Sequence, residues 1–219
     1  MTQGFVIAID GPAASGKGTI ADGLGRAYGL PVLDSGLLYR AVGVNVLRHG
    51  GDPADPTMAE AAAKALDPAD LSDPAFRTRE AGEAASQAAA HPGVRAALKD
   101  FQQRFAAQTP GSVIDGRDIG TVIAPEAPAK LFVTASPEVR AERRFKQLRG
   151  QGEAVAYDDI LADIRRRDER DSGRAAAPLA MADDAALLDT TSMSISEAAD
   201  AARRIVEEAR ARWEISRQG

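Results

Sequence analysis

The stretch that decides the fold is Phe5-Val-Ile-Ala-Ile-Asp10 followed by Gly11-Pro-Ala-Ala-Ser-Gly16-Lys17-Gly18-Thr19. The first six residues are an apolar, β-branched run closed by Gly11-Pro12, which is typical of a buried strand. The glycine-rich segment leads into a helical stretch from about Lys17 to Tyr28. A strand, a glycine-rich loop and a helix in this order predict the phosphate-binding unit of an α/β protein.

Residues 11–19 match the G-x-x-x-x-G-K core of a Walker A loop. Gly11 and Gly16 would let backbone N–H groups turn inward around phosphate oxygens, at a helix N-terminus whose partial positive charge favours anions. Lys17 would bring a positive charge to the β- and γ-phosphates, and a glycine-rich turn without a ligand is the alternative. The predicted nucleotide site comprises Gly11, Pro12, Ala13, Ala14, Ser15, Gly16, Lys17, Gly18 and Thr19.

Position 18 departs from the strict motif, which has Ser or Thr directly after the lysine. Here Gly18 follows Lys17 and the hydroxyl comes one residue later, at Thr19. We therefore expect the nucleotide phosphates and water to hold Mg²⁺, as is common for this ion. The G-K-G-T variant is similar to the loop of the nucleoside-monophosphate kinases.

Strands alternate with helices along most of the remaining chain. Further strands are expected at 31–34, 112–115, 130–135 and 185–189, and further helices at 36–48, 137–148, 157–170 and 195–213. Between residues 52 and 108 the pattern gives way to an Asp-, Pro- and Ala-rich part with one short helix and then a hairpin of two helices. We predict an α/β fold, a doubly wound five-stranded parallel sheet covered on both faces, with a helical insert.

Length and composition limit the possible function classes. The 219 residues suit one domain, and the absence of cysteine excludes disulfides and thiol nucleophiles. A net charge of −5 argues against general nucleic-acid binding. The N-terminus lacks a signal peptide, and no apolar run approaches the roughly 20 residues of a membrane span. We expect a cytoplasmic protein without nucleic-acid or membrane partners.

A phosphate loop alone could serve a GTPase, a motor ATPase or a small-molecule kinase. A GTPase needs an N-K-x-D motif, but the only asparagine, Asn45, lies in Val-Asn-Val-Leu. A motor ATPase would carry a strand ending in Asp-Glu. Here the corresponding strand ends Asp115-Gly-Arg-Asp118, which offers a cation for a second phosphate and favours a kinase.

Four motifs resemble those of the bacterial cytidylate kinases. They are Asp34-Ser-Gly-Leu-Leu-Tyr-Arg40, Asp115-Gly-Arg-Asp-Ile-Gly-Thr121, Arg144-Phe-Lys-Gln-Leu148 and Arg167-Asp-Glu-Arg-Asp-Ser-Gly-Arg174 followed by Ala177-Pro178-Leu179. The resemblance covers about residues 5–191. It implies a P-loop nucleoside-monophosphate kinase that uses Mg²⁺ and transfers the γ-phosphoryl of ATP to CMP and dCMP, usually as a monomer.

The resemblance also implies a domain layout. A single P-loop kinase domain would have its core at 1–51 and 109–219, a nucleoside-monophosphate-binding insert at about 52–108, and a lid at about 149–156. The insert is shorter than in many bacterial members, because the β-rich stretch before Arg77 is missing.

Arginines dominate the remaining candidates. Phosphoryl transfer between two nucleotides gathers negative charge, so catalysis is mainly positioning and charge stabilisation. The permanently charged fork of arginine binds phosphate bidentately. Arginines 40, 117, 167 and 174 fall at strand ends or helix starts that the fold would converge on one cleft. The catalytic candidates are Lys17, Arg117, Arg167 and Arg174.

The resemblance assigns the other binding residues. The acceptor phosphate would contact Ser35, Arg40, Arg117, Arg167 and Arg174, the ribose hydroxyls Asp171, and the cytosine Ser86, Arg95 and Asp118. Asp118 could instead orient Arg117 through an ion pair. A solvated surface charge is the alternative for any single arginine, and Arg165, Arg166 and Arg170 fit that alternative.

Two aspartates end neighbouring strands near the loop. Either Asp34 or Asp115 could hold Mg²⁺ through water, and the alternatives are a helix N-cap or an arginine partner; we favour Asp115 as the metal ligand. No general base is required, because the acceptor phosphate is already anionic at neutral pH. The competing hypotheses are a P-loop kinase for another small acceptor, such as UMP or shikimate, and a non-catalytic nucleotide-binding protein.

Overall fold

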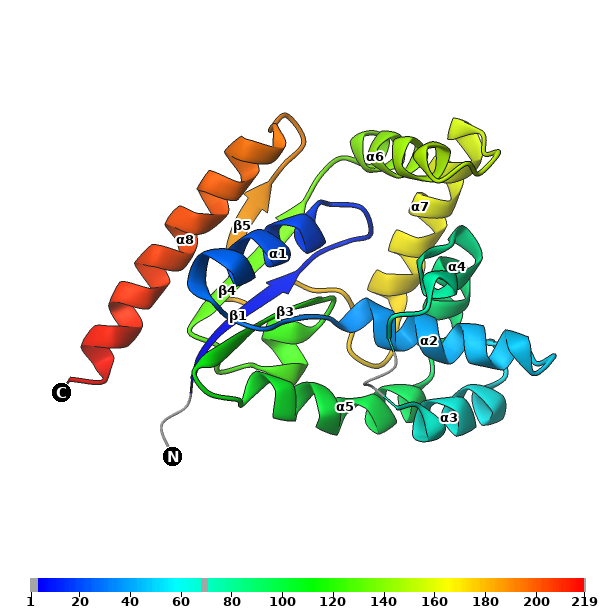
Figure 1. Cartoon of the computed structure of the whole chain (residues 1–219), viewed down its shortest axis with the longest axis horizontal. Helices are drawn as coiled ribbons and strands as arrows, with labels where there is room; N and C mark the ends of the chain where they lie inside the picture. The colour runs from blue at the N-terminus through cyan, green and yellow to red at the C-terminus, as the bar shows by residue number, and fades with distance from the viewer. Residues whose placement is uncertain (1–3, 68–70, 219) are drawn as a thin grey trace.

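Five parallel strands form one sheet in the order β2-β3-β1-β4-β5 in the computed structural model, which describes residues 4–67 and 71–218 (Figure 1). The strands are β1 (Phe5–Asp10), β2 (Val32–Asp34), β3 (Gly111–Gly116), β4 (Ala129–Thr134) and β5 (Ala186–Asp189). The α-helices are α1 (Lys17–Tyr28), α2 (Ser35–Arg48), α3 (Pro56–Ala65), α4 (Arg79–Ala88), α5 (Pro92–Ala106), α6 (Pro137–Gly150), α7 (Tyr157–Gly173) and α8 (Ile195–Ser216). Two short turns, η1 (Pro74–Arg77) and the π-helical η2 (Ile119–Ile123), complete the fold. The predicted parallel α/β sheet is confirmed.

The register of the strands aligns their carboxyl ends. The central strand β1 is buried along its whole length and pairs with β3 and β4, Asp10 lying opposite Gly116. Strand β2 pairs with β3 so that Asp34 lies opposite Asp115. The loops that follow β1, β2 and β3 therefore leave the sheet at one edge, which is where parallel sheets bind ligands.

The two faces of the sheet bury different sets of side chains. Ile7 and Ile9 share a core with α1 and α8, whereas Val6 and Ala8 share one with α5 and η2. This alternation follows from the period of two residues along a strand. Each fully buried isoleucine contributes about 1.5–3 kcal/mol. Neither α8 nor any other helix in residues 4–67 and 71–218 is long and apolar enough to cross a membrane.

The described part of the insert consists of helices joined by turns and short irregular segments. Helices α2, α3, α4 and α5 form a separate core that includes Leu38, Ala85 and Val94. The prediction is one short helix followed by a hairpin of two helices. The short helix is confirmed by α3, and α4 and α5 follow it as two helices, but the hairpin is wrong, because α4 packs on α2 and α5 packs on α3 rather than along each other. Residues 52–67 and 71–108 contain no strand. Residues 68–70 of the predicted insert, and residues 1–3 and 219 of the predicted core, lie outside the described residues.

Helices α6 and α7 form an arm beyond the carboxyl edge of the sheet (Figure 1). Its small core contains Leu148, Ile160 and Ile164 and includes contacts to Ala13 and Ala14 of the glycine-rich loop. Several helices run further than predicted: α6 ends at Gly150 rather than Leu148, α7 at Gly173 rather than Arg170, and α8 at Ser216 rather than Trp213. Arg149 and Gly150 of the predicted lid are thus helical, and the connecting segment is 151–156.

Candidate functional site

The glycine-rich loop joins β1 to α1 and needs glycine at both ends. A Cβ on Gly11 would lie 2.0 Å from the Val133 backbone oxygen, and Gly16 holds φ at +93° as the N-cap of α1. Only glycine adopts such backbone conformations at low cost. The loop therefore has the predicted strand–loop–helix context. A Cβ on Gly18 would meet nothing within 4 Å, so this position faces open space.

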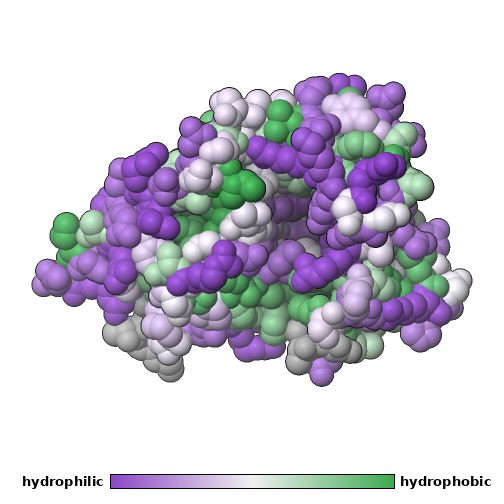
Figure 2. Space-filling model, turned by 45° about the horizontal axis from the view of Figure 1, so that its top comes forward, coloured by the Kyte–Doolittle hydropathy of each residue, from purple (hydrophilic) through white to green (hydrophobic). Residues whose placement is uncertain are grey.

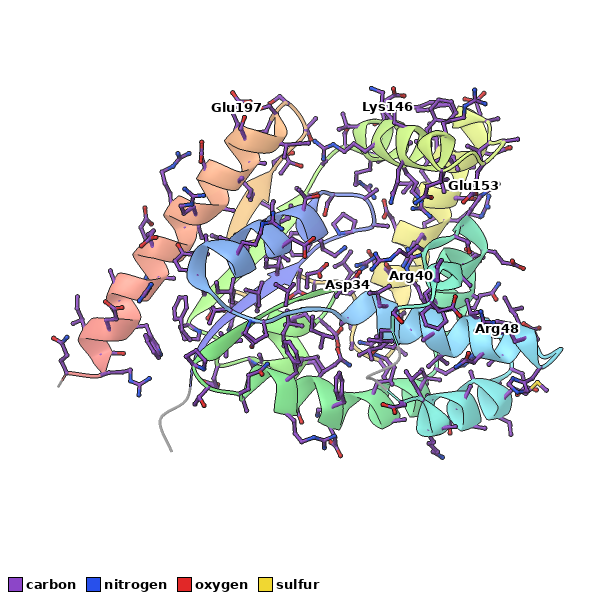
Figure 3. All side chains as sticks on the ribbon, in the orientation of Figure 1. Asp34, Arg40, Arg48, Lys146, Glu153 and Glu197 are labelled. Carbon is purple, nitrogen blue, oxygen red and sulfur yellow. The ribbon has the colours of Figure 1, made fainter. Side chains whose placement is uncertain are left out.

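A cleft of about 660 Å³ extends from this loop across the strand ends to α4, α6 and α7. Hydrophilic residues border a hollow near the middle of the view in Figure 2. Figure 3 labels Asp34 and Arg40 where α2 begins beside the strand ends. The lining includes the predicted site residues Ala13, Ala14, Ser15, Gly16, Lys17, Gly18, Thr19, Arg40, Asp115, Arg117 and Arg167.

Lys17 and Asp115 face each other at the closed end of the cleft. The Lys17 Nζ lies 3.8 Å from Asp115 Oδ2, and only 12% of the Lys17 side chain is exposed. Burial and the nearby Arg117 lower the pKa of Lys17, while burial and the neighbouring Asp34 raise the pKa of Asp115. Burial disfavours the charged form of each group, and the attraction between Lys17 and Asp115 offsets the two pKa shifts only in part.

The side chains of Asp34 and Asp115 have different hydrogen-bond partners in the structure. Asp34 is the N-cap of α2, and its Oδ1 accepts a hydrogen bond of 2.9 Å from the Gly36 N–H. Asp115 is buried, and its Oδ1 accepts no hydrogen bond from the part of the chain that the structure describes. No group of three potential metal-ligating side chains occurs within residues 4–67 and 71–218. A lone carboxylate beside a phosphate loop fits a Mg²⁺ ion that keeps most of its ligands from nucleotide and water.

Three arginines crowd the opposite side of the cleft. Arg40 donates to the Phe76 and Thr78 carbonyls, and Arg117 Nε donates to Asp171 Oδ2 at 2.9 Å. Burial and the neighbouring Arg144 lower the pKa of Arg40 to about 10. Burial and Arg117 lower the pKa of Arg167 to about 9. These groups remain protonated at neutral pH, so the cleft concentrates positive charge that favours an anionic ligand.

Asp171 on α7 lies at the centre of this arginine cluster. Its carboxylate is 2.9 Å from Arg117, 3.9 Å from Arg167 and 3.6 Å from Arg174. Burial alone would raise the pKa of Asp171, but the three guanidinium groups outweigh it and lower the pKa. Asp171 therefore holds three arginines in one place: one from the turn after β3, one from α7 and one that directly follows α7.

The residues predicted to meet cytosine lie next to the cleft rather than in its lining. Arg95 donates to Asp118 at 2.5 Å, and both side chains are buried. The Arg95 guanidinium also lies over the Tyr39 ring, 5.4 Å from its centre. Asp118 thus pairs with Arg95, and the alternative that it orients Arg117 by an ion pair is wrong, because Arg117 pairs with Asp171.

Unsatisfied polar atoms concentrate in the same region. Within the described part of the chain, four buried side-chain atoms lack a hydrogen-bond partner: Ser15 Oγ, Asp115 Oδ1, Arg167 Nε and Arg174 Nε. Buried polar groups are normally paired. All four belong to the predicted site, which indicates that a polar ligand completes it.

Comparison with known proteins now adds to this geometry. The model of the cytidylate kinase family matches residues 7–208. The chain belongs to this family. It is 68% identical to a cytidylate kinase of Caulobacter sp. (strain K31), over 95% of this chain and 97% of that protein. It is 69% identical to a cytidylate kinase of Caulobacter vibrioides (strain NA1000 / CB15N), over 97% and 100%.

Solved structures of lower identity share the fold. A gluconokinase from Sinorhizobium meliloti 1021 has a TM-score of 0.52 at 15% identity, covering 98% of this chain and 97% of that one. An uncharacterized protein from Eubacterium ventriosum has a TM-score of 0.55 at 16% identity, covering 94% and 99%. Membership of the cytidylate kinase family makes the chain a phosphotransferase, with ATP as the implied phosphoryl donor.

The sequence indicates surface charges at Arg165, Arg166 and Arg170, but in this cytidylate kinase family member Arg170 contacts a residue of the candidate site. Arg170 donates to Ser86 Oγ at 2.7 Å, whereas the exposed Arg165 and Arg166 pair with Glu138 and Asp163. Helical spacing could have identified it, since positions 167, 170 and 171 lie on one face of α7. Two arginines of α6, Arg143 and Arg144, also line the cleft. Of these two, only Arg144 belongs to one of the four motifs that resemble those of the bacterial cytidylate kinases.

Proposed function

We propose that the chain transfers the γ-phosphoryl of ATP to CMP and dCMP, giving CDP or dCDP and ADP. The observation that carries this proposal is one cleft with two anion sites: the loop with Lys17 on one side, and Arg40, Arg117 and Arg167 on the other. Two phosphate sites facing each other suit two nucleotides whose phosphates must meet. The names of the curated relatives point to cytidylate as the acceptor.

The donor would bind on the loop side. Backbone N–H groups of residues 11–19 and the unpaired Ser15 Oγ would hold its phosphates, and Lys17 would contact the β- and γ-phosphates. The cleft continues along Met193, Ile195 and Ala198, which offer an apolar surface for the donor base. Mg²⁺, held through water by Asp115 and directly by the phosphates, would supply charge neutralisation when bound.

The acceptor would bind on the arginine side. Ser35, Arg40, Arg117, Arg167 and Arg174 would hold its phosphate, Asp171 its ribose, and Ser86, Arg95 and Asp118 its base. The acceptor phosphate oxygen would attack the γ-phosphorus as the bond to the β–γ bridging oxygen breaks. Lys17, Arg117, Arg167 and Arg174 would stabilise the charge that develops. No general base is needed, because the attacking oxygen is already anionic.

The proposal includes the domain layout and the setting. Residues 52–108 would serve as the acceptor-binding insert and 149–156 as the lid, on a core of 1–51 and 109–219. We infer a monomer, as the resemblance to the bacterial cytidylate kinases implies. We also place the enzyme in the cytoplasm, where its proposed substrates are available.

A panel of acceptors tests this function. Purified protein with ATP and Mg²⁺ should form ADP rapidly with CMP and dCMP, and far more slowly with UMP, AMP, GMP and shikimate. Chelating Mg²⁺ with EDTA should abolish turnover, because the phosphate charges are no longer neutralised. Preference for UMP or shikimate would replace the proposed acceptor, and no turnover with any acceptor would favour the non-catalytic alternative.

The lid gives a second prediction. Residues 151–156 form a largely exposed connection between α6 and α7, with Glu153 at its centre (Figure 3). Burial lowers the pKa of Arg144, which lines the cleft, and the nearby Glu153 opposes this shift, so the segment is electrostatically linked to the site. ATP and CMP together should protect residues 149–156 from hydrogen exchange, because closure would exclude water.

The control for the lid is the exposed C-terminal half of α8, which should exchange equally with and without ligands. Each nucleotide alone should give weaker protection of 149–156 than the pair. Equal exchange of 149–156 in the free and doubly liganded protein would rule out closure of this segment.

A further inference from the structure

Asp10 is the last residue of β1 and directly precedes the glycine-rich loop. It is buried, with only 4% of its surface exposed. Its Oδ1 accepts a hydrogen bond of 2.7 Å from the Ile119 N–H, and its Oδ2 accepts one of 2.7 Å from the Gly120 N–H. Both carboxylate oxygens of Asp10 therefore hold the first two residues of η2.

The backbone of Asp10 fixes the other end of the same turn. In the parallel register of β1 and β3, Asp10 lies opposite Gly116, which is the last residue of β3. Two residues, 117 and 118, connect β3 to η2. Asp10 thus holds this connection at its start through strand pairing and at its end through its side chain.

Asp118 directly precedes η2 and pairs with another side chain instead of capping that turn. An aspartate in this position normally accepts a hydrogen bond from an N–H two or three residues further on. Among the described residues, the Asp118 side chain makes no such bond with η2, and it pairs with Arg95. The Gly120 N–H, two residues after Asp118, donates to Asp10. Asp10 therefore caps η2 from a different strand and leaves the Asp118 carboxylate for Arg95.

We propose that Asp10 is a positioning residue for the acceptor side of the cleft and acts through Arg117. Arg117 lines the cleft, and its Nε donates to Asp171 Oδ2 at 2.9 Å. The inference rests on the proposed function, in which Arg117 binds the acceptor phosphate. By fixing the connection between β3 and η2, Asp10 keeps the Arg117 guanidinium in the cleft before the acceptor arrives. A group that is already in place loses less conformational entropy on binding.

Two other roles for Asp10 lead to different expectations. If Asp10 only supports the glycine-rich loop that follows it, its replacement should weaken ATP binding and leave CMP binding unchanged. If Asp10 only stabilises the sheet, its replacement should lower the free energy of unfolding and leave the Kd of both nucleotides unchanged for the folded protein. Positioning through Arg117 predicts weaker CMP binding with unchanged ATP binding.

The experiment compares Asp10→Asn, Arg117→Met and the double variant Asp10→Asn/Arg117→Met by isothermal titration with CMP and with ATP at pH 8. Burial raises the pKa of Asp10 to about 6, so at pH 8 the carboxylate is ionised and accepts through both oxygens. Asparagine keeps one acceptor oxygen and turns an NH2 group toward the other backbone N–H.

We expect Asp10→Asn to raise the Kd for CMP roughly tenfold, because Arg117 would then occupy its binding position for only part of the time. The Kd for ATP should change less than about twofold. In the assay of ADP formation, KM for CMP should rise while KM for ATP stays close to that of wild type. The double variant should bind CMP no more weakly than Arg117→Met alone, because Asp10 acts through that arginine.

Ser112→Ala is the matched control. Ser112 is a buried residue at the other end of β3, and its Oγ donates to the Ala106 carbonyl at 3.3 Å. This variant also loses a buried hydrogen bond and should leave the Kd of both nucleotides unchanged. Urea unfolding measures the stability of each variant. If Asp10→Asn does not fold, Gly120→Ala carries the test, because a Cβ there would lie 3.3 Å from Asp10 Oδ2 and disturb the same contact.

Amide hydrogen exchange of the wild-type protein, followed by NMR, tests the preformed turn without any substitution. The N–H groups of Ile119 and Gly120 should be strongly protected in the absence of nucleotide, since both are held by a buried carboxylate. Addition of CMP should change their protection little. Unprotected exchange of these two groups in the free protein would contradict the inference.

The binding data can overturn the inference in three ways. An unchanged Kd for CMP in Asp10→Asn, a selective loss of ATP binding, or additive losses in the double variant would each do so. Failure of the wild-type protein to phosphorylate CMP would instead contradict the proposed function. The two failures are distinguishable, because the exchange of the Ile119 and Gly120 N–H groups is measured without substrate.

Discussion

Replacing Lys17 by alanine is expected to lower kcat at least about 100-fold, with CMP and ATP both saturating. The Lys17 ammonium lies at the closed end of the cleft, where it would follow the γ-phosphoryl through transfer. In a poorly hydrated site the loss of one charge-stabilising donor costs far more than it would in water. A coupled assay of ADP formation measures the effect. A variant that keeps more than half of the wild-type kcat would remove Lys17 from the mechanism.

Folding needs a separate control in this experiment. Lys17 is largely buried beside Asp115, so Lys17→Ala leaves a buried carboxylate with less compensation. The double variant Lys17→Ala/Asp115→Asn removes that unpaired charge. Both variants should bind CMP with an affinity close to that of wild type by isothermal titration, since Lys17 faces the donor. Loss of CMP binding in both would indicate that the cleft itself has changed.

The fold was predictable because the residue pattern of the first strand and loop and the alternation of strands and helices along the chain indicate the same architecture. The run Phe5-Val-Ile-Ala-Ile-Asp10 is apolar throughout, as expected for a central parallel strand, and the glycines that follow it are required by backbone geometry. Helix ends were less predictable. Helices α6, α7 and α8 each continue past the residue where the hydrophobic pattern stops, because backbone hydrogen bonds persist until the chain turns away.

Side-chain partners were the hardest part to predict. Asp118 follows Arg117 in the chain, yet it pairs with Arg95, 23 positions away. Both residues lie in the bend between β3 and η2, where Arg117 pairs with Asp171 and Asp118 with Arg95, so their adjacency in the sequence did not indicate their partners. Asp34 and Asp115 are similar by sequence. The structure distinguishes them, because Asp34 accepts a hydrogen bond from the Gly36 N–H as a helix cap, whereas Asp115 faces Lys17 and its Oδ1 has no hydrogen-bond partner among the described residues.

Asp118→Ala is expected to lower kcat/KM for CMP by a factor that corresponds to about 1–3 kcal/mol of lost transition-state stabilisation. The effect on kcat/KM for UMP should be much smaller. Cytosine presents an exocyclic amine that a carboxylate can accept from, whereas uracil presents O4 in the same place. Against uracil, Asp118 would face another acceptor, and a buried acceptor oxygen left without a hydrogen-bond donor is costly. Steady-state kinetics with both acceptors measures the change in preference. An equal loss for CMP and UMP would exclude a base-reading role for Asp118.

The ion pair with Arg95 determines how this experiment must be controlled. Asp118→Ala leaves the buried Arg95 guanidinium without its partner, which can cost about 3–5 kcal/mol of stability on its own. Asp118→Asn keeps an oxygen for Arg95 and adds an amide N–H that can donate to O4 of uracil. If Asp118 reads the base, Asn should raise kcat/KM for UMP above that of the alanine variant while CMP stays low. If Asp118 only supports Arg95, Asn should restore both acceptors in parallel, because the contact with the arginine is the part that it preserves.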